Sequence, residues 1–512
     1  MSARFPRVAS LRGATGLRAR LGELGCPLPC DDEILSAPDS PLADALPLPP
    51  SVPGGPREAG GPRVGNRWVI QPMEGWDGTH QGLPTELTRR RWRRFGRSGA
   101  GWIWGGEAVA VRADGRANPH QLLISEDTAA ALGALRRELL EAARVAAESG
   151  DAPALERPPL VGLQLTHSGR WSRPTEAGPA PRIAFRHPLL DPRVGVADDT
   201  TLWRDRELEE LVRDYARAAA LAQAEGFDFV DLKHCHGYLL HEFLAARHRP
   251  GRFGGPRLED RTRFCFEILD AVRDAAPGLA VGVRLSAFDR VPHRPATAGD
   301  AEAKSGRRPG RGVPESHPRP YELGFGVDQE APERSDLREA IALVRALVEA
   351  GVRWFNVSAG SPYYVPHIQR PAAFPPSDGY EPPEDPLVGV TRLLQAARTL
   401  KREVPEATIV STGWSYLQEY LPHTAQACVR EGWFDAVGLG RMALSYPHLP
   451  ADVMAGRPLE RRLLCRTFSD CTTAPRNGMV SGCYPLDDFY KRRPEHETLE
   501  RLKRSAAEGE TR

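Results

Sequence analysis

The sequence predicts a parallel (β/α)8 barrel, the TIM barrel, and three observations lead to this fold class. Short apolar segments follow one another between residues 65 and 460, longer segments of helical period separate them, and glycine and polar residues gather where the apolar segments end. Alternating strands and helices are typical of parallel α/β folds. A doubly wound sheet is the alternative fold, because a count of strands does not prove that the sheet closes.

The predicted strands are short runs rich in branched and aromatic side chains, as strands of a parallel sheet usually are. They cover residues 67–72, 101–106, 159–165, 227–233, 279–285, 352–358, 407–412 and 434–439. Between them, apolar side chains return every three or four residues, the spacing that gives a helix an apolar face. The predicted helices cover residues 85–98, 127–148, 206–225, 258–275, 336–350, 388–403 and 415–431.

Three segments lie outside this alternation. Residues 1–64 are rich in proline and glycine, which predicts an N-terminal extension that cannot hold regular structure for long. Residues 290–335 interrupt the pattern after the fifth strand, and we expect either a lid over the active site or a mobile surface insertion. Residues 461–512 form a cysteine-containing C-terminal extension, whose charged part at 484–512 would cover a neighbouring subunit or face solvent.

Composition excludes several classes of function. The 512 residues are 41% hydrophobic and 26% charged, as expected for a soluble globular protein. The 68 basic and 67 acidic residues nearly cancel, so we expect no nucleic-acid partner. Because no apolar run approaches the roughly 20 residues that span a bilayer and no apolar leader begins the chain, we expect a cytoplasmic protein without membrane contact. The eight cysteines mostly stand apart, which favours reduced thiols.

Residues suited to binding an anion follow the seventh and eighth predicted strands, and another lies at the end of the fifth strand. Glycines at 413 and 440 would let backbone N–H groups approach a phosphate, and Arg441 could close on it with a fork of donors. Arg284 stands at the end of an apolar strand, where a guanidinium needs an anionic or strongly accepting partner. That partner could be a bound ligand or a carboxylate in a structural salt bridge.

The order of the motifs at the strand ends resembles the Old Yellow Enzyme family of NAD(P)H:flavin oxidoreductases. Pro-Met follows the first strand, Gln-Leu-x-His-x-Gly-Arg the third and His-Gly-Tyr-Leu the fourth, with Phe253-Gly254-Gly255 and Arg261 downstream. Val-Arg-Leu-Ser lies at the fifth strand and Gly-x-Gly-Arg at the eighth, so the resemblance covers about residues 66–450. It implies a noncovalent FMN over the carboxyl-terminal mouth of the barrel, with NADH or NADPH as electron donor.

The resemblance assigns a set of strand-end residues to FMN. They are Pro72, Met73, Glu74, Ala108, Gln164, Arg284, Gly413, Gly440 and Arg441. Gln164 would hydrogen-bond the pyrimidine ring, Arg284 would neutralise charge near N1 and O2, and the last three would hold the phosphate. Glu74 departs from the family, which commonly has threonine or cysteine there. An ionised glutamate would oppose further negative charge on reduced FMN and lower its potential.

The fourth strand carries the residues that the resemblance assigns to catalysis. In the family this strand ends with a histidine, then two residues, then a histidine or asparagine, and then Gly-Tyr. The pair binds the carbonyl oxygen of an activated alkene, and the tyrosine protonates its α-carbon. This sequence keeps His236 and Tyr238 but has Lys233 in place of the first histidine. An ammonium there could stabilise a developing enolate oxygen; the alternative is an ion pair with Asp231 or Glu74.

Two neighbouring histidines and the late cysteines have simpler explanations. We interpret His234 and His241 as ordinary polar residues flanking the site.

Flavoproteins related to 2,4-dienoyl-CoA reductase hold a [4Fe–4S] cluster on four cysteines after the barrel. Here Cys471 and Cys483 fit the last two positions, the first two fall on Leu464 and Thr467, and Cys465 is one residue out of register. With three cysteines in place of four, we predict no cluster and no metal.

Together these features predict an FMN-dependent oxidoreductase that passes hydride from NAD(P)H to an alkene conjugated with a carbonyl or carboxyl group. One alternative is a flavin-dependent dehydrogenase that oxidises an amine or a similar substrate. A second is a non-redox phosphate-binding barrel in which Lys233 forms a Schiff base, and a third is an inert binding barrel. Each implies a small-molecule ligand, and the oligomeric state stays open, with a homodimer as one possibility.

Overall fold

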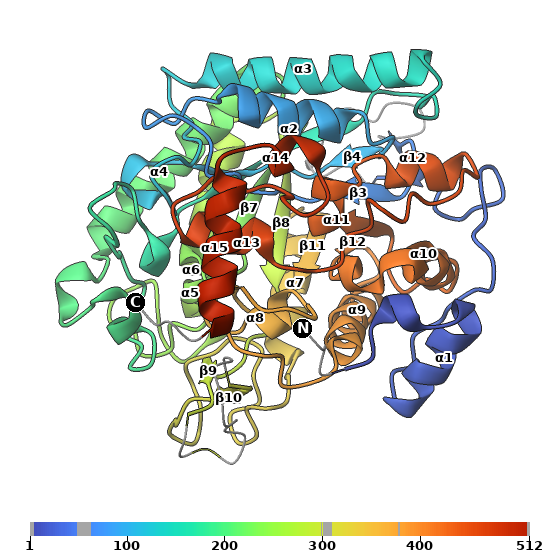
Figure 1. The fold of residues 1–512 in the computed structure, drawn as a ribbon. Helices are drawn as coiled ribbons and strands as arrows, with labels where there is room; N and C mark the ends of the chain where they lie inside the picture. The colour runs from blue at the N-terminus through green and yellow to red at the C-terminus, as the bar shows by residue number, and fades with distance from the viewer. Residues whose placement is uncertain (1–4, 49–62, 298–299, 301–309, 377–378, 509–512) are drawn as a thin grey trace.

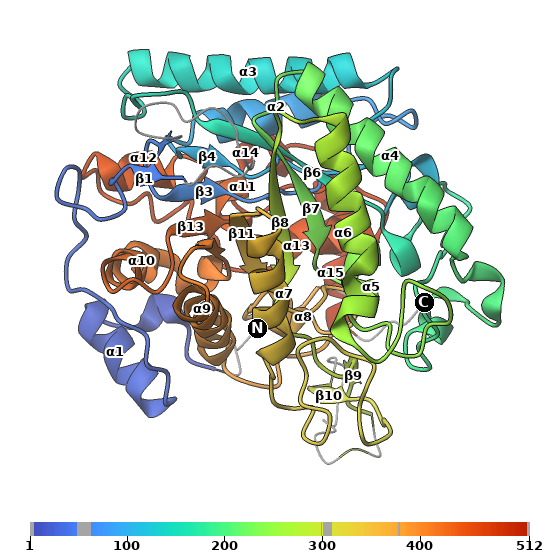
Figure 2. The same cartoon turned by 180° about the vertical axis from the view of Figure 1, so that it is seen from behind.

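A closed barrel of eight parallel strands forms the centre of the molecule, and helices surround it (Figures 1 and 2). The computed structural model describes residues 5–48, 63–297, 300, 310–376 and 379–508. The barrel strands are β3 (Trp68–Ile70), β4 (Trp102–Ile103), β6 (Leu160–Thr166), β7 (Phe229–His234), β8 (Ala280–Ser286), β11 (Trp354–Ser358), β12 (Thr408–Ser411) and β13 (Ala436–Leu439). Strand β4 pairs with both β3 and β6, which closes the sheet. The predicted TIM barrel is therefore confirmed, and the doubly wound alternative is wrong.

The second predicted strand is broken in two. The chain leaves β4, turns at Gly105 and Gly106, both with positive φ, and pairs again with β6 as β5 (Ala108–Ala110). An added Cβ at Gly106 would lie 2.4 Å from the Trp92 ring, so only glycine fits this turn. The break brings Ala108 beside Gln164, its partner in register.

Each predicted helical segment contains a helix that packs an apolar face on the barrel. The helices are α2 (Glu86–Gly96), α3 (Ala129–Glu148), α4 (Asp205–Ala224), α6 (Leu258–Ala275), α7 (Arg338–Glu349), α9 (Pro386–Glu403) and α10 (Leu421–Arg430), the last preceded by the 3-10 helix η6 (Trp414–Tyr420). Helix α4, for example, buries Leu208, Leu211 and Tyr215, which share one face. Helix α9 begins with a proline after Asp385, whose side chain accepts a hydrogen bond from the Leu387 N–H.

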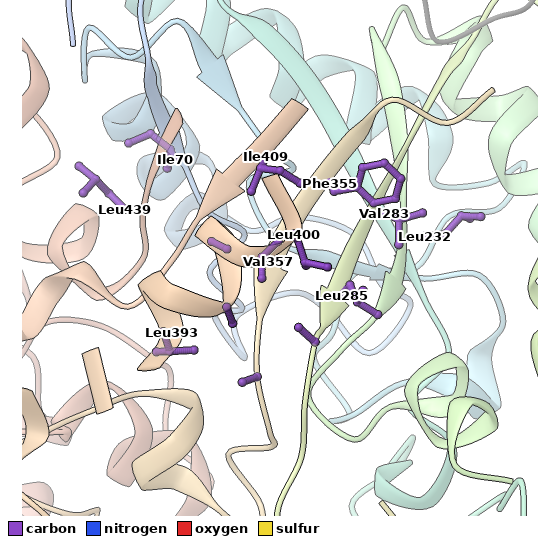
Figure 3. Close-up of a cluster of buried hydrophobic side chains, with 14 of the residues drawn as sticks. Ile70, Leu232, Val283, Leu285, Phe355, Val357, Leu393, Leu400, Ile409 and Leu439 are labelled. Carbon is purple, nitrogen blue, oxygen red and sulfur yellow. The ribbon is translucent and has the colours of Figure 1, made fainter. Parts of the chain in front are cut away.

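Alternate side chains of the strands build two apolar layers. Figure 3 shows the outer layer, in which Phe355 and Ile409 of the strands lie with Leu393 and Leu400 of α9. The inner layer lies at the strand starts and is largely aromatic: Trp102, Trp104, Phe229 and Trp354 pack with ring centroids 4.8–5.8 Å apart. These rings fill the amino-terminal end of the barrel, so a ligand site is left to the carboxyl-terminal end.

The N-terminal extension holds more regular structure than predicted. It contains the 3-10 helix η1 (Val8–Ser10), helix α1 (Gly13–Glu23) and a short antiparallel pair, β1 (Leu46–Pro47) with β2 (Arg63–Val64). Helix α1 buries Leu17 and Leu21 in the main core, and Arg20 forms a 2.7 Å ion pair with Asp385. Tertiary burial thus stabilises a helix that local composition did not indicate. The remaining proline- and glycine-rich residues, 49–62, lie outside the described residues.

The insertion after β8 contains a short antiparallel pair, β9 (His293–Pro295) with β10 (Gly312–Pro314). Residues 298–299 and 301–309, between these strands, lie outside the described residues. Further along, Tyr321 packs with Val291 and Val327 in a small buried cluster. Figure 1 shows β9 and β10 at one edge of the molecule. Whether the segment acts as a lid stays a prediction.

The C-terminal extension folds back onto the barrel. It contains α13 (Asp470–Arg476), α14 (Asp488–Lys491) and α15 (Glu495–Glu508), seen in red in front of the strands in Figure 1. Its own small core includes Tyr484, Tyr490 and Leu499. Asp487 accepts hydrogen bonds of 2.9 and 3.0 Å from Arg90 of α2, which ties the extension to the barrel. Among the described residues, no helix is both long and apolar enough to cross a membrane.

Candidate active site

The carboxyl-terminal ends of the strands surround an open pocket. Its volume is about 1310 Å³, which includes the solvent space at its mouth. Every residue that the sequence assigned to the cofactor or to catalysis lines this pocket. They are Pro72, Met73, Glu74, Ala108, Gln164, Lys233, His236, Tyr238, Arg284, Gly413, Gly440 and Arg441. Parallel topology explains the convergence, because all eight strands end on the same side of the barrel.

A glycine-rich cradle lies after the last two strands. Gly413 has φ of 102°, a left-handed conformation, and an added Cβ would lie 2.7 Å from Leu393, so another residue would be strained there. At Gly440 an added Cβ would meet only Met73 Sδ, at 3.6 Å, which leaves the backbone accessible from the pocket. Beside it, one Arg441 nitrogen donates to the Pro371 carbonyl at 2.8 Å. The other terminal nitrogen is buried and meets no acceptor among the described residues.

Arg284 and Gln164 are oriented by Asp231 in the strand between them. The Gln164 amide donates to one Asp231 carboxylate oxygen at 2.5 Å, and the Arg284 backbone N–H donates to the other at 2.6 Å. Arg284 is 6% exposed as a residue, its side chain forms no ion pair with any described carboxylate, and its Nε has no described acceptor. Burial lowers the pKa of Arg284. The structural salt bridge is therefore not found, and the guanidinium lacks the partner that its burial requires.

Lys233, in the fourth barrel strand, lines the pocket. Its ammonium lies 3.8 Å from the centroid of the Tyr238 ring. Neither Asp231 nor Glu74 forms an ion pair with it in the described part of the chain, so the ion pair that was the alternative to a functional role is not found. Burial lowers the pKa of Lys233 to about 8, although the charge of Glu74 opposes this effect. The residue therefore stays charged at neutral pH but titrates at mildly alkaline pH.

Glu74 lies at the end of the first strand and is half-buried in the pocket wall. One of its carboxylate oxygens accepts a 2.7 Å hydrogen bond from the Asn118 side chain. Burial raises the pKa of Glu74, while the charge of Lys233 lowers it. The glutamate thus places a carboxyl group in a pocket wall that otherwise carries lysine and arginine.

The loop after β7 holds His236 in a left-handed conformation, with φ of 66°. The His236 N–H donates to Ser286 Oγ at 3.1 Å, and its Nε2 lies 3.0 Å from Ser358 Oγ. Burial lowers the pKa of His236 well below its usual value, so the ring is neutral. A non-glycine residue adopts this conformation only where its surroundings hold it there.

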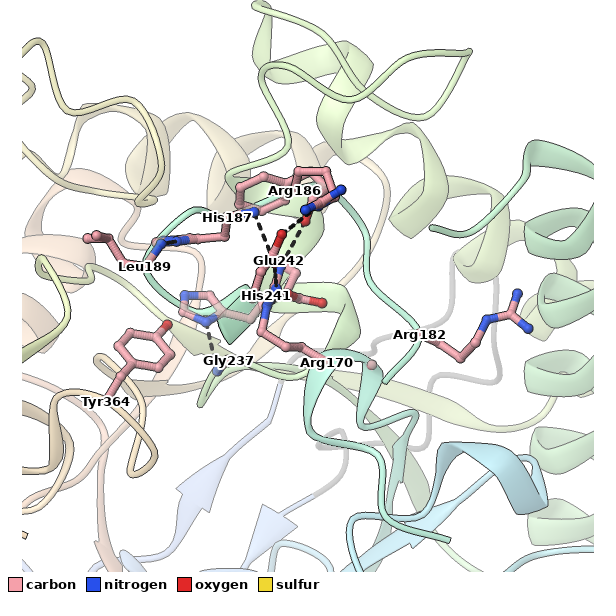
Figure 4. Close-up of polar contacts among 12 residues, drawn as sticks. Arg170, Arg182, Arg186, His187, Leu189, Gly237, His241, Glu242 and Tyr364 are labelled. Carbon is pink, nitrogen blue, oxygen red and sulfur yellow. Dashed lines mark hydrogen bonds and ion pairs between the residues drawn. The ribbon is translucent and has the colours of Figure 1, made fainter. Parts of the chain in front are cut away.

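His241, which the sequence analysis interpreted as a polar residue flanking the site, is one of the groups that hold this loop. Its Nδ1 accepts the Gly237 N–H at 2.9 Å (Figure 4). Burial lowers the pKa of His241 to about 3, so Nδ1 keeps its lone pair at neutral pH. Figure 4 also shows Arg170 beside Glu242, to which its Nε donates at 2.6 Å. His234 and His241 do not line the pocket.

Tyr238 forms a hydroxyl pair with a residue that the sequence did not single out. The hydroxyl oxygens of Tyr238 and Tyr363 lie 2.9 Å apart. Tyr363 follows β11 and stacks on Trp171, with ring centroids 4.3 Å apart and planes 8° from parallel. Burial raises the pKa of Tyr238 well above its usual value, so the phenol is protonated at neutral pH. The place of Tyr363 just beyond a strand end was the signal that could have identified it.

Further pocket residues escaped the sequence analysis. They are Gln71, Trp76, Ser358, Pro362, Tyr363, Gln369, Arg370, Thr472, Pro475, Arg476 and Ser481. Most of the residues before Thr472 follow strand ends, where a search of the loops would have found them. The last four belong to the C-terminal extension, which the Ser481 N–H ties to the Gly75 carbonyl at 2.7 Å. Nothing in their local sequence indicates that they reach the barrel mouth.

Cys465, Cys471 and Cys483 gather beside Arg441 around a small cavity. They are not joined in a disulfide, and burial raises the pKa of each thiol. Their sulfur atoms do not form a group within 4.8 Å of one another, and no fourth described cysteine lines the cavity. The four thiolates that a [4Fe–4S] cluster takes are thus not assembled in the described residues.

Comparisons with known proteins find likenesses in sequence and in fold. The model of the NADH:flavin oxidoreductase / NADH oxidase family matches residues 156–303. NADPH dehydrogenase from Bacillus velezensis is 36% identical over 132 residues, which are 25% of this chain and 36% of that protein. The match therefore spans about a third of the length of this relative.

Two solved structures share the fold at low identity. The complex of 2-naphthoyl-CoA reductase with 2-naphthoyl-CoA has a TM-score of 0.60 and 18% identity, over 88% of this chain and 57% of that one. Morphinone reductase in complex with tetrahydroNAD has a TM-score of 0.51 and 19% identity, over 82% of this chain and 92% of that one. At such identities the likeness concerns the barrel fold.

Proposed function

We propose that the chain, on its match to the NADH:flavin oxidoreductase / NADH oxidase family and its resemblance to the Old Yellow Enzymes, is an FMN-dependent oxidoreductase. It would take electrons from NADH or NADPH and reduce an alkene conjugated with a carbonyl or carboxyl group. The observation that carries the proposal is a pair of arginines, Arg284 and Arg441, which line one pocket and each hold a buried donor without a described acceptor.

The residues of the pocket fit FMN. A phosphate needs several N–H donors and a cation, which Gly413, Gly440 and Arg441 offer at the glycine-rich cradle. A flavin pyrimidine ring needs a donor and a positive charge near its oxygen atoms, which Gln164 and Arg284 offer. When bound, FMN would supply the hydride-transfer chemistry that no side chain of the pocket can perform.

The remaining pocket residues suit the substrate of such a reaction. His236 and Lys233 would bind the carbonyl or carboxylate oxygen, and the ammonium would stabilise the negative charge that develops there. Tyr238 would deliver a proton to the α-carbon. Its raised pKa supports this role, because the hydroxyl carries a proton at neutral pH. Glu74 would oppose negative charge on the reduced cofactor and so favour passing the electrons on.

Anaerobic half-reactions test the proposal. The FMN-loaded protein is first reduced with NADH or NADPH and then mixed with a cyclic enone or an unsaturated acid, while flavin absorbance is recorded. We expect bleaching by the nicotinamide and recovery of absorbance with the alkene. In Tyr238→Phe the bleaching should persist while alkene reduction falls about a hundredfold, the scale of a general acid. Bleaching without recovery for every conjugated alkene would refute the ene-reductase assignment.

A further inference from the structure

The hydroxyl pair of Tyr238 and Tyr363 joins a buried phenol to one nearer the open pocket. Tyr238 is 4% exposed, whereas Tyr363 is half-buried and lines the same pocket. Their oxygens lie 2.9 Å apart, and either hydroxyl can be the donor. Proton exchange between Tyr238 and solvent therefore has a direct route through Tyr363.

The position of Tyr363 is fixed from two sides. Trp171 stacks on the Tyr363 ring, with ring centroids 4.3 Å apart, and the Tyr363 backbone N–H donates to Ser361 Oγ at 3.2 Å. A phenol held in this way presents its hydroxyl to Tyr238 without losing rotational freedom in each turnover. The contact is therefore a preorganised feature of the pocket.

A proton donor in a buried site must be reloaded. If Tyr238 gives its proton to a substrate carbon, its oxygen is left as a phenolate, and a buried phenolate is costly without a donor. Burial raises the pKa of both phenols, so both carry protons at neutral pH. The neighbouring O–H of Tyr363 can donate that hydrogen bond and pass its proton along it as the phenolate forms.

Two other groups near Tyr238 are less well placed for this task. The Lys233 ammonium lies over the face of the Tyr238 ring, 3.8 Å from its centroid, which favours a cation–π contact. Glu74 accepts a 2.7 Å hydrogen bond from Asn118, and a hydrogen bond with Tyr238 lowers its pKa, but an ionised carboxylate can only accept a proton and so cannot replace the one that Tyr238 gives away.

We propose that Tyr363 is the second member of a proton relay that acts through Tyr238. This inference rests on the function proposed above. The substrate receives its hydride at the β-carbon, and the electron pair left on the α-carbon takes the Tyr238 proton. In the same step the Tyr363 proton moves to the Tyr238 oxygen, and Tyr363 afterwards takes a proton from solvent at the pocket mouth. Each O–H bond broken is thus formed again, and NAD(P)H supplies both electrons.

The test compares Tyr363→Phe with wild type in the two half-reactions. We expect alkene reduction to slow about tenfold, the scale of one lost hydrogen bond, with unchanged FMN affinity and unchanged reduction by NAD(P)H. Tyr364→Phe is the matched control, because its hydroxyl donates to Asp289 at 2.7 Å and the residue does not line this pocket. It should leave alkene reduction unchanged. Equal rates for Tyr363→Phe and wild type would overturn the relay.

A double-mutant cycle separates a relay from loose packing. In the Tyr238→Phe background, Tyr363→Phe should cause no further loss of rate, because there is no proton to replace. Unfolding midpoints of the FMN-free single and double variants should also be non-additive, since the hydroxyl pair forms without cofactor. Additive losses of rate or additive midpoints would each contradict the relay.

A measurement on wild type covers the case in which the variants do not fold. Alkene reduction in mixtures of H₂O and D₂O should give a bowed dependence of rate on deuterium fraction, because two protons move. A linear dependence would mean that one proton moves and would overturn the relay. If wild-type protein does not bleach with NAD(P)H at all, the proposed function fails; if it does and only these tests fail, the relay alone is wrong.

Discussion

Lys233→Met removes a charge that the fold holds away from water, and we expect it to raise stability while it lowers activity. The Lys233 side chain is 5% exposed and forms no ion pair among the described residues. Methionine has a similar length and no charge, so it can occupy the same space without the desolvation cost. The same replacement removes the cation proposed to hold the substrate oxygen.

The size of the gain follows from the pKa of Lys233, which burial lowers from 10.5 to about 8. Each factor of ten in proton affinity is about 1.4 kcal/mol, so holding the charged form costs the fold about 3 kcal/mol at neutral pH. Loss of the cation–π contact with Tyr238 offsets about 1 kcal/mol of this. We expect a net gain of about 2 kcal/mol in the free energy of unfolding at neutral pH.

The pH dependence gives the prediction its sign. Between pH 8 and 10.5 the unfolded chain binds the Lys233 proton and the folded chain does not, so wild-type stability rises with pH in this window relative to Lys233→Met. The advantage of the variant is therefore complete at pH 7 and disappears near pH 10.5.

Urea unfolding of FMN-free protein, followed by tryptophan fluorescence at neutral pH and at pH 10, measures this difference. Lys233→Arg is the control, because it keeps the charge and should not gain stability. If Lys233→Met is destabilised at neutral pH and equally so at pH 10, the ammonium has a stabilising partner. The reasoning about Lys233 would then be refuted.

Three further predictions concern the same pocket. Arg284→Met should weaken FMN binding, measured by fluorescence titration, about thirtyfold to a hundredfold, because a charge-assisted hydrogen bond is lost. Unchanged affinity would mean that Arg284 does not face the flavin. Glu74→Gln should raise the flavin midpoint potential by tens of millivolts, where about 30 mV corresponds to 1.4 kcal/mol for two electrons. A lower potential in a dye-coupled titration would contradict this. The rate of alkene reduction should fall about tenfold per pH unit above about pH 8 as Lys233 loses its proton. The decline should be absent in Lys233→Arg, and the same decline in that variant would mean that another group causes it.

The barrel could be predicted because its determinants are local. Each strand is a short apolar run, and each helix shows an apolar face, so both periods can be read along the chain. Helix α1 was not predicted, because its stability comes from burying Leu17 and Leu21 against residues distant in sequence. The break at Gly105 and Gly106 was not predicted either, since it depends on the fit of the Trp92 ring.

The pocket was predictable to the extent that parallel topology gathers strand ends. This is why Gln164, Arg284 and Arg441 meet although they are far apart in the chain. The part built by the C-terminal extension, including Thr472, could not be predicted, because tertiary packing alone brings it to the barrel mouth. The same holds for the contact of Lys233 with an aromatic ring, where the sequence offered carboxylates as partners.

The visible absorption spectrum of the purified protein tests the central claim most directly, because every role proposed for the pocket assumes a bound flavin. The protein, or protein incubated with FMN and then desalted, should show flavin absorption that bleaches on anaerobic addition of NADH or NADPH. A protein that stays colourless after incubation with FMN would contradict the account, although the barrel and its pocket would remain.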